Sequence, residues 1–157
     1  MTGVVMRAFC QFIMVLLATV SSACSMDSTN DLIWAAHEGN LENVRRLIAN
    51  GTNVNARAFD DGQTALIAAV RGGQSPMIEF LLSVGADINL KDAGGTPLYW
   101  AAFGGQAEIF DYLLTRGARL DADEKSLSYL LLVMRGKGFT ELAKVVRAEA
   151  EREARGK

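Results

Sequence analysis

The chain has 157 residues, of which 50% are hydrophobic and 22% are charged, a composition typical of one ordinary globular domain. Its formal net charge is −2, so it carries no overall positive charge with which to hold a nucleic acid. It contains one histidine and two cysteines, which excludes most zinc sites and most cysteine–histidine catalytic pairs.

The first residues follow the pattern of a secretory signal peptide. One cation, Arg7, precedes an apolar run from Phe9 to Val20, and small residues follow that run. A permanent membrane helix needs about 20 apolar residues, so a cleaved signal is favoured over a spanning segment. Either Met1 or Met6 can serve as the start of this signal.

The end of this segment, VSSAC, resembles the lipobox of bacterial lipoproteins, with Ala23 directly before Cys24. The resemblance implies that residues 1–23 are removed and that acyl chains on Cys24 anchor the mature chain to a membrane. Ser21 departs from the family, which most often has leucine there, and an ordinary signal cleaved at the same place is the alternative. Because Ser25 rather than aspartate follows the cysteine, the resemblance implies an exported protein on the periplasmic side of the envelope, anchored to the outer membrane.

From about residue 30 onward the chain repeats itself. The segment Thr96–Ala118 has the residue pattern of Thr64–Ala86, which lies 32 positions earlier, and Leu32–Gly51 matches it 34 positions further back. Each unit predicts a helix, a turn, a second helix and a loop. The predicted N-caps of the first helices are Asn30, Thr64, Thr96 and Ser128, and the predicted left-handed ends of the second helices are Gly51, Gly85 and Gly117.

The unit GGTPLYWAAFGGQAEIFDYLLTRGA resembles an ankyrin repeat, and so do GQTALIAAVRGGQSPMIEFLLSVGADIN and LIWAAHEGNLENVRRLIANGTNVN. The resemblance implies an all-α solenoid of stacked helix–turn–helix units with finger loops. A fourth, degenerate unit ends in the charged sequence RAEAEREARGK, which is interpreted as a polar cap on the last repeat. The predicted segments are a tether at 24–29, repeats at about 30–61, 62–94 and 95–126, and a capping repeat at 127–157.

In ankyrin repeats the finger loops and the exposed turn after the first helix are free to bind a protein. The first predicted finger, residues 56–63, is longer than the second, and Phe59 at its tip stands beside Asp60. Phe59 is a candidate interface residue, and its folding back onto the neighbouring repeat is an equally open alternative.

Four positions after the first helices are predicted to line up along the concave surface: His37, Arg71, Phe103 and Arg135. An aromatic ring between two arginines is typical of the centre of a protein interface. The alternative is a set of solvated arginines beside one half-buried phenylalanine. Trp34 and Trp100 are predicted to lie in the core, because each precedes an alanine that faces the neighbouring helix.

The sequence predicts no enzymatic chemistry, no cofactor and no metal. In the stretch DADEKS, residues 121–126, a calcium loop would need oxygen ligands where Lys125 and, further on, Leu132 stand. We therefore expect a monomeric, membrane-anchored module that binds a protein partner in the bacterial envelope. The more specific alternatives are an immunity or inhibitor protein that neutralises a periplasmic toxin or enzyme, and a scaffold or protective factor for an envelope protein.

Overall fold

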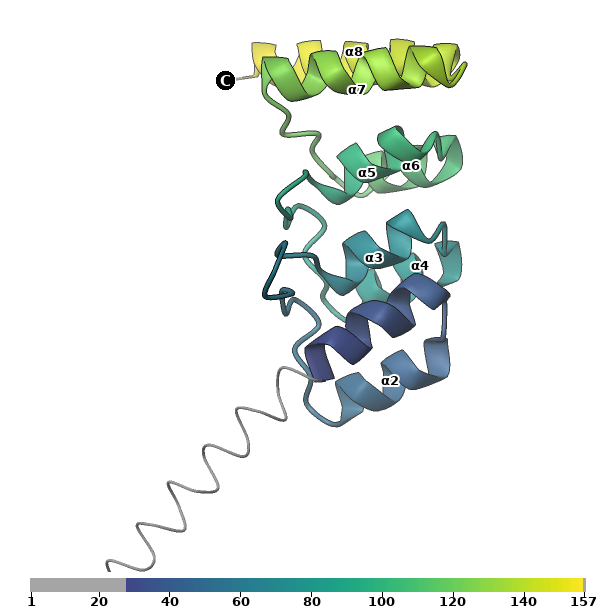
Figure 1. Cartoon of the computed structure of the whole chain (residues 1–157), viewed down its shortest axis with the longest axis vertical. Coiled ribbons are helices and arrows are strands. Elements are labelled where there is room, and N and C mark those ends of the chain that lie inside the picture. The colour runs from purple at the N-terminus through teal and green to yellow at the C-terminus, as the bar shows by residue number, and fades with distance from the viewer. Residues whose placement is uncertain (1–27, 157) are drawn as a thin grey trace, which may run out of the picture.

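The computed structural model describes residues 28–156, and all regular secondary structure in this range is helical (Figure 1). The helices form antiparallel pairs that stack along one axis, while the finger loops all project on one side of the stack. The predicted all-α solenoid is confirmed. The helices are residues 28–38, α2 (Leu41–Ala49), α3 (Ala65–Arg71), α4 (Ser75–Ser83), α5 (Pro97–Gly104), α6 (Ala107–Thr115), α7 (Glu124–Gly136) and α8 (Thr140–Arg155).

Two of the four predicted N-caps are confirmed. Thr64 accepts a hydrogen bond from the Ile67 backbone N–H and Thr96 accepts one from the Tyr99 N–H, each at 3.3 Å. Each threonine therefore satisfies one of the N–H groups that the first turn of its helix leaves without a partner.

The other two predicted N-caps are wrong. Asn30 lies inside the helix of residues 28–38, and α7 begins five residues earlier than an N-cap at Ser128 predicts. Its cap is Asp123, which accepts the Ser126 N–H at 2.7 Å, and hydrogen bonding to Ser126 lowers the pKa of Asp123. At the other end of the repeats, the predicted left-handed caps Gly51, Gly85 and Gly117 are confirmed, with φ of 91°, 92° and 85°.

The core is continuous along the stack because each helical pair buries its apolar face against the next pair. Leucines at the start of the first helices, Leu32, Leu66 and Leu98, are at most 1% exposed. Alanines such as Ala69 and Ala101 are fully buried and let the helices approach closely. Two repeats approach closely at Gly72, where a Cβ atom would overlap the backbone carbonyl of His37 in the preceding repeat.

Side chains also tie each loop to the next. Asn55 accepts the Asp87 N–H at 2.8 Å and donates to the Gly85 carbonyl at 3.1 Å, and Asn89 accepts the Arg119 N–H at 2.8 Å. At the last loop this role passes to Glu153 of α8, whose carboxylate accepts the backbone N–H groups of Leu120 at 2.7 Å and Asp121 at 3.2 Å. The charged end of the chain is therefore a helix that closes the last repeat, which agrees with its interpretation as a cap.

The start of the fold differs from the predicted tether. Residues 28 and 29, the last two of the tether predicted at 24–29, are already helical. The predicted signal peptide and Cys24 lie outside the described residues. Within residues 28–156, every helix is too short or too polar to cross a bilayer.

The contact at Gly72 leads to a stability prediction. We expect Gly72→Ala to lower the free energy of unfolding by about 1–3 kcal/mol, because the new methyl group forces two repeats apart. Gly136→Ala is the matched control: it also lies at the end of a first helix, nothing would touch its Cβ, and alanine favours the helix. Urea unfolding checks both variants, and equal stability of the two would contradict the close approach.

Candidate functional site

The backbone turns that end the first helices fix the register of the four repeats. In each turn a glycine N–H donates to the carbonyl three residues earlier, at 2.9–3.3 Å. His37, Arg71 and Phe103 all stand two residues before this glycine, so they occupy equivalent positions, as predicted. Arg135 stands three residues before its glycine and is the counterpart of Ala102, so its predicted alignment with Phe103 is wrong. The glycine–carbonyl pairs are Gly39–Ala36, Gly73–Val70, Gly105–Ala102 and Gly138–Arg135.

The displacement of Arg135 has a simple cause. The sequence Arg135-Gly136 looks like Phe103-Gly104, and α7 ends at Gly136 as α5 ends at Gly104, but one more residue, Lys137, precedes the left-handed turn glycine Gly138. Arg135 instead lines a hollow at the last helical pair, together with Thr140 and Arg147. The cation that reaches Phe103 is Lys137, which the sequence analysis missed. Aligning Gly138 with Gly105 would have found it.

We call the first helix of each pair the inner helix and the second the outer helix. Three aromatic rings form a cluster on the inner helix α5. The Phe103 centroid lies 6.5 Å from that of Tyr99 in a stacked arrangement and 5.6 Å from that of Trp100 in an edge-on arrangement. Arg71 of the preceding repeat lies over Trp100 at 4.6 Å, and Lys137 of the following repeat lies over Phe103 at 4.8 Å. The structure therefore places Phe103 between two cations, through pairings that differ from those predicted.

The two tryptophans have different surroundings although their positions are equivalent. Trp100 is half-buried, so its predicted core position is only partly correct, and Trp34 is 65% exposed, so its predicted core position is wrong. Trp100 packs towards Arg71 of the preceding repeat, whereas no repeat precedes Trp34 within the described residues. Trp34 instead stacks on His37, with ring centroids 6.0 Å apart.

A buried carboxylate orients Trp100. Asp92, in the second finger loop, is 7% exposed and accepts the backbone N–H groups of Gly94 and Gly95, each at 2.8 Å. It also accepts the indole N–H of Trp100, at 3.0 and 3.1 Å to its two oxygens. The sequence analysis missed Asp92, although an aspartate two residues before a glycine is a known turn-forming pattern.

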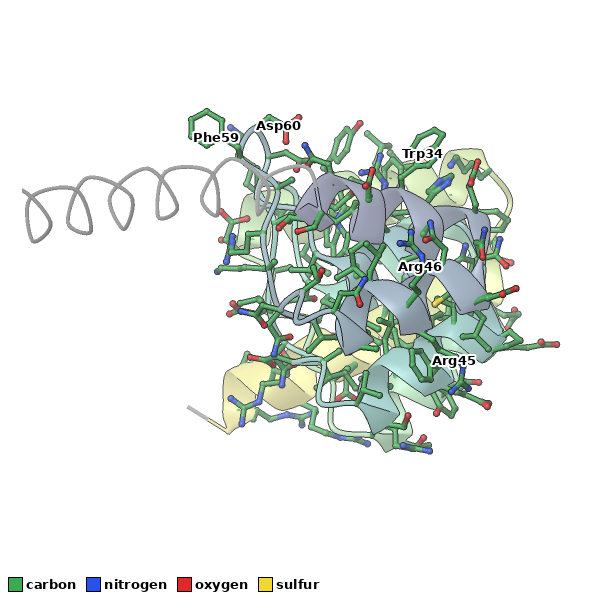
Figure 2. All side chains as sticks on the ribbon, turned by 90° about the horizontal axis from the view of Figure 1, so that it is seen from below. Trp34, Arg45, Arg46, Phe59 and Asp60 are labelled. Carbon is green, nitrogen blue, oxygen red and sulfur yellow. The ribbon has the colours of Figure 1, made fainter. Side chains whose placement is uncertain are left out.

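The finger loops are tied to one another, but the tip of the first one is free. The Arg57 guanidinium donates to the Lys91 carbonyl at 2.7 Å, and the Lys91 ammonium pairs with Asp121 at 3.0 Å. Phe59 is 90% exposed, so it does not fold back onto the neighbouring repeat. Asp60 is also exposed, and its carboxylate accepts the next backbone N–H at 2.9 Å. Figure 2 shows Phe59, Asp60 and Trp34 on the same side of the stack.

Two features of the described residues bear on the chemistry of this surface: the grouping of metal-binding side chains and the pKa of Tyr99. Between residues 28 and 156, no three histidine, cysteine, aspartate or glutamate side chains gather as a metal site would require. Burial raises the pKa of the Tyr99 hydroxyl, and the neighbouring Tyr129 and Asp123 raise it further, so the ring stays neutral at physiological pH. The surface offers two cations, aromatic faces and a free loop tip.

Comparison with known families agrees with this architecture. The family described as Ankyrin repeats (3 copies) matches residues 10–92 and 32–124, which together cover more than half of the chain. The chain belongs to the ankyrin-repeat family. Ankyrin-repeat modules are typically non-catalytic and bind proteins through the extended concave surface that the stacked repeats create.

Similar proteins match only part of this chain. The chain is 43% identical over 60 residues to the human Arf-GAP with coiled-coil, ANK repeat and PH domain-containing protein 3, covering 38% of this chain and 7% of that protein. It is 38% identical over 57 residues to Xenopus tropicalis myotrophin, covering 36% and 48%, and 41% identical over 61 residues to the bovine mitochondrial disaggregase, covering 39% and 9%. The chain thus spans less than half the length of each of these relatives.

The position of Asp92 leads to a second prediction. We expect Asp92→Ala to release the Trp100 indole, shift its fluorescence to longer wavelength and lower the free energy of unfolding by about 1–3 kcal/mol. The measurement is made with Trp34→Phe in every protein, so that Trp100 is the sole emitter among the two tryptophans of the sequence. Asp92→Asn, which keeps an oxygen acceptor, is the control and should stay close to the parent. An unchanged spectrum in Asp92→Ala would show that Asp92 does not position the ring.

Proposed function

We propose that this chain is a non-enzymatic module that binds a protein partner through its inner helices and finger loops. The observation that supports this most directly is the arrangement of Phe103 and Trp100 between Arg71 and Lys137. Aromatic residues and arginine are enriched at the centres of protein interfaces. The exposed ring of Phe59 lies on the same side of the stack as Trp34, the counterpart of Trp100 in the first repeat (Figure 2).

We further propose that the module acts in a bacterial envelope, anchored by a lipid on Cys24. The support for this is the sequence alone: an apolar run that ends in VSSAC, with Cys24 as the first residue of the expected mature chain. Few residues separate Cys24 from the helix of residues 28–38, so the lipid would hold the repeats close to the membrane surface.

Partner binding is tested with variants that change exposed side chains alone. We expect the double variant Phe59→Ala, Arg71→Ala to retain less than about a tenth of the partner captured by the parent from an envelope extract. Its free energy of unfolding should fall by no more than about 1 kcal/mol, because both side chains are exposed and the contact of Arg71 with Trp100 is the one that is lost.

A matched control is available on the outer helices. Arg45 of α2 lies over the ring of Phe80 at 4.3 Å, as Arg71 lies over Trp100, but on the other side of the stack from Trp34 (Figure 2). Arg45→Ala should capture as much partner as the parent. Equal capture by all the variants would rule out the inner surface as the binding site.

Lipid anchoring is tested separately, in cells. We expect Cys24→Ala to move the protein from the membrane fraction to the soluble fraction or to block its maturation, because the thiol that receives the lipid is gone. Cys10→Ala is the control, since Cys10 lies in the segment predicted to be removed. Membrane fractionation and metabolic labelling with a fatty acid measure the result, and a labelled Cys24→Ala protein would disprove the assignment.

A further inference from the structure

The surface between the second and fourth repeats holds two cations that form no salt bridge with a described carboxylate. We call the side chains of Arg71, Trp100, Phe103 and Lys137 the inner cation platform. Each cation rests on a ring, and within the described residues neither forms a salt bridge. Lys91 differs, because its ammonium is paired with Asp121 at 3.0 Å.

The hydrogen-bonding groups of both cations are available to a ligand. The Arg71 guanidinium forms no hydrogen bond with any described residue, so its five N–H donors are free. The Lys137 ammonium makes one long contact, 3.5 Å to the Phe103 carbonyl, which leaves two of its three donors. A guanidinium held against a ring is also pre-oriented to receive a carboxylate in a two-pronged bond.

The two rings between the cations favour a ligand that carries an apolar group. Trp100 and Phe103 are both half-buried, and their centroids lie 5.6 Å apart. Burying their exposed parts is favourable for an apolar or aromatic group that lies between the two charges. The ligand that fits therefore carries negative groups on both sides of an apolar one.

We propose that the inner cation platform binds an acidic segment of the partner protein, with carboxylates on Arg71 and Lys137 and an apolar side chain between them, against the exposed parts of Trp100 and Phe103. This inference rests on the proposed function and specifies the kind of partner.

The charges around the platform favour an acidic peptide over a nucleic acid. Glu38 occupies in the first repeat the position that Lys137 holds in the last, so the face is negative at one end. Asp60 is exposed at the tip of the first finger. A continuous polyanion would meet both carboxylates, whereas a short acidic segment covers only the second to fourth repeats.

The test uses the tryptophan emission of the full-length chain, because both tryptophans lie on the inner helices. The probe is a short synthetic peptide of repeated Glu–Leu–Asp units, compared with peptides of Lys–Leu–Lys units and Gln–Leu–Asn units and with a single-stranded oligonucleotide. We expect only the acidic peptide to change the emission, and its affinity to fall at least about fivefold when the salt concentration is raised from about 0.05 M to about 0.5 M.

Variants assign this response to the platform. Arg71→Gln with Lys137→Gln should weaken acidic-peptide binding about tenfold, whereas Arg45→Gln, which removes the matched cation on the outer helices, should leave it unchanged. The proposal is overturned if the acidic peptide gives no response, if the neutral or basic peptide or the oligonucleotide binds as tightly, or if the double variant binds like the parent. Any of these results leaves the capture experiment intact, so partner binding as such can stand while its acidic character fails.

Discussion

Every part of this structure depends on the contact between one helical pair and the next. A single pair of helices cannot bury its own apolar face, so its leucines and alanines leave water only when a neighbour covers them. The fit is tight enough that Gly72 has no room for a side chain against His37. Hydrogen bonds also connect each loop to the next. Asn55 and Asn89 each accept a backbone N–H from the following loop, and Glu153 of α8 accepts one at the last loop.

The inner cation platform exists only because of this stacking. Its arginine, its rings and its lysine come from three successive units, and none of these units holds a cation over an aromatic ring of its own inner helix. The spacing between repeats therefore sets the geometry of the surface. Asp92 fixes the orientation of one ring on this surface, because it accepts the indole N–H of Trp100 and so connects a finger loop to an inner helix. A partner bound here would contact several repeats at once, so its affinity would depend on how the repeats are stacked.

The two ends of the stack show how strongly burial depends on neighbours. Trp34 and Trp100 hold the same position in their repeats, yet Trp34 is 65% exposed because within the described residues nothing stacks in front of it. At the other end, Leu132 is 69% exposed while its counterpart Tyr99 is 6% exposed, since no described repeat follows Leu132. Core positions inferred from one repeat therefore hold only for repeats that have a neighbour on both sides.

The sequence by itself determined the solenoid, two of its helix N-caps and the three left-handed glycines that end the second helices, because these follow from local patterns that recur in phase. It also placed His37, Arg71 and Phe103 at equivalent positions, since the first three turns have the same length. The sequence analysis misplaced Arg135 and missed Lys137, because one extra residue between Gly136 and the turn glycine Gly138 changes the register while Arg135-Gly136 still resembles Phe103-Gly104. The pairing of cations with rings, the burial of Asp92 and the exposure of Trp34 were decided only by the tertiary structure, because each depends on a group from another repeat or on its absence.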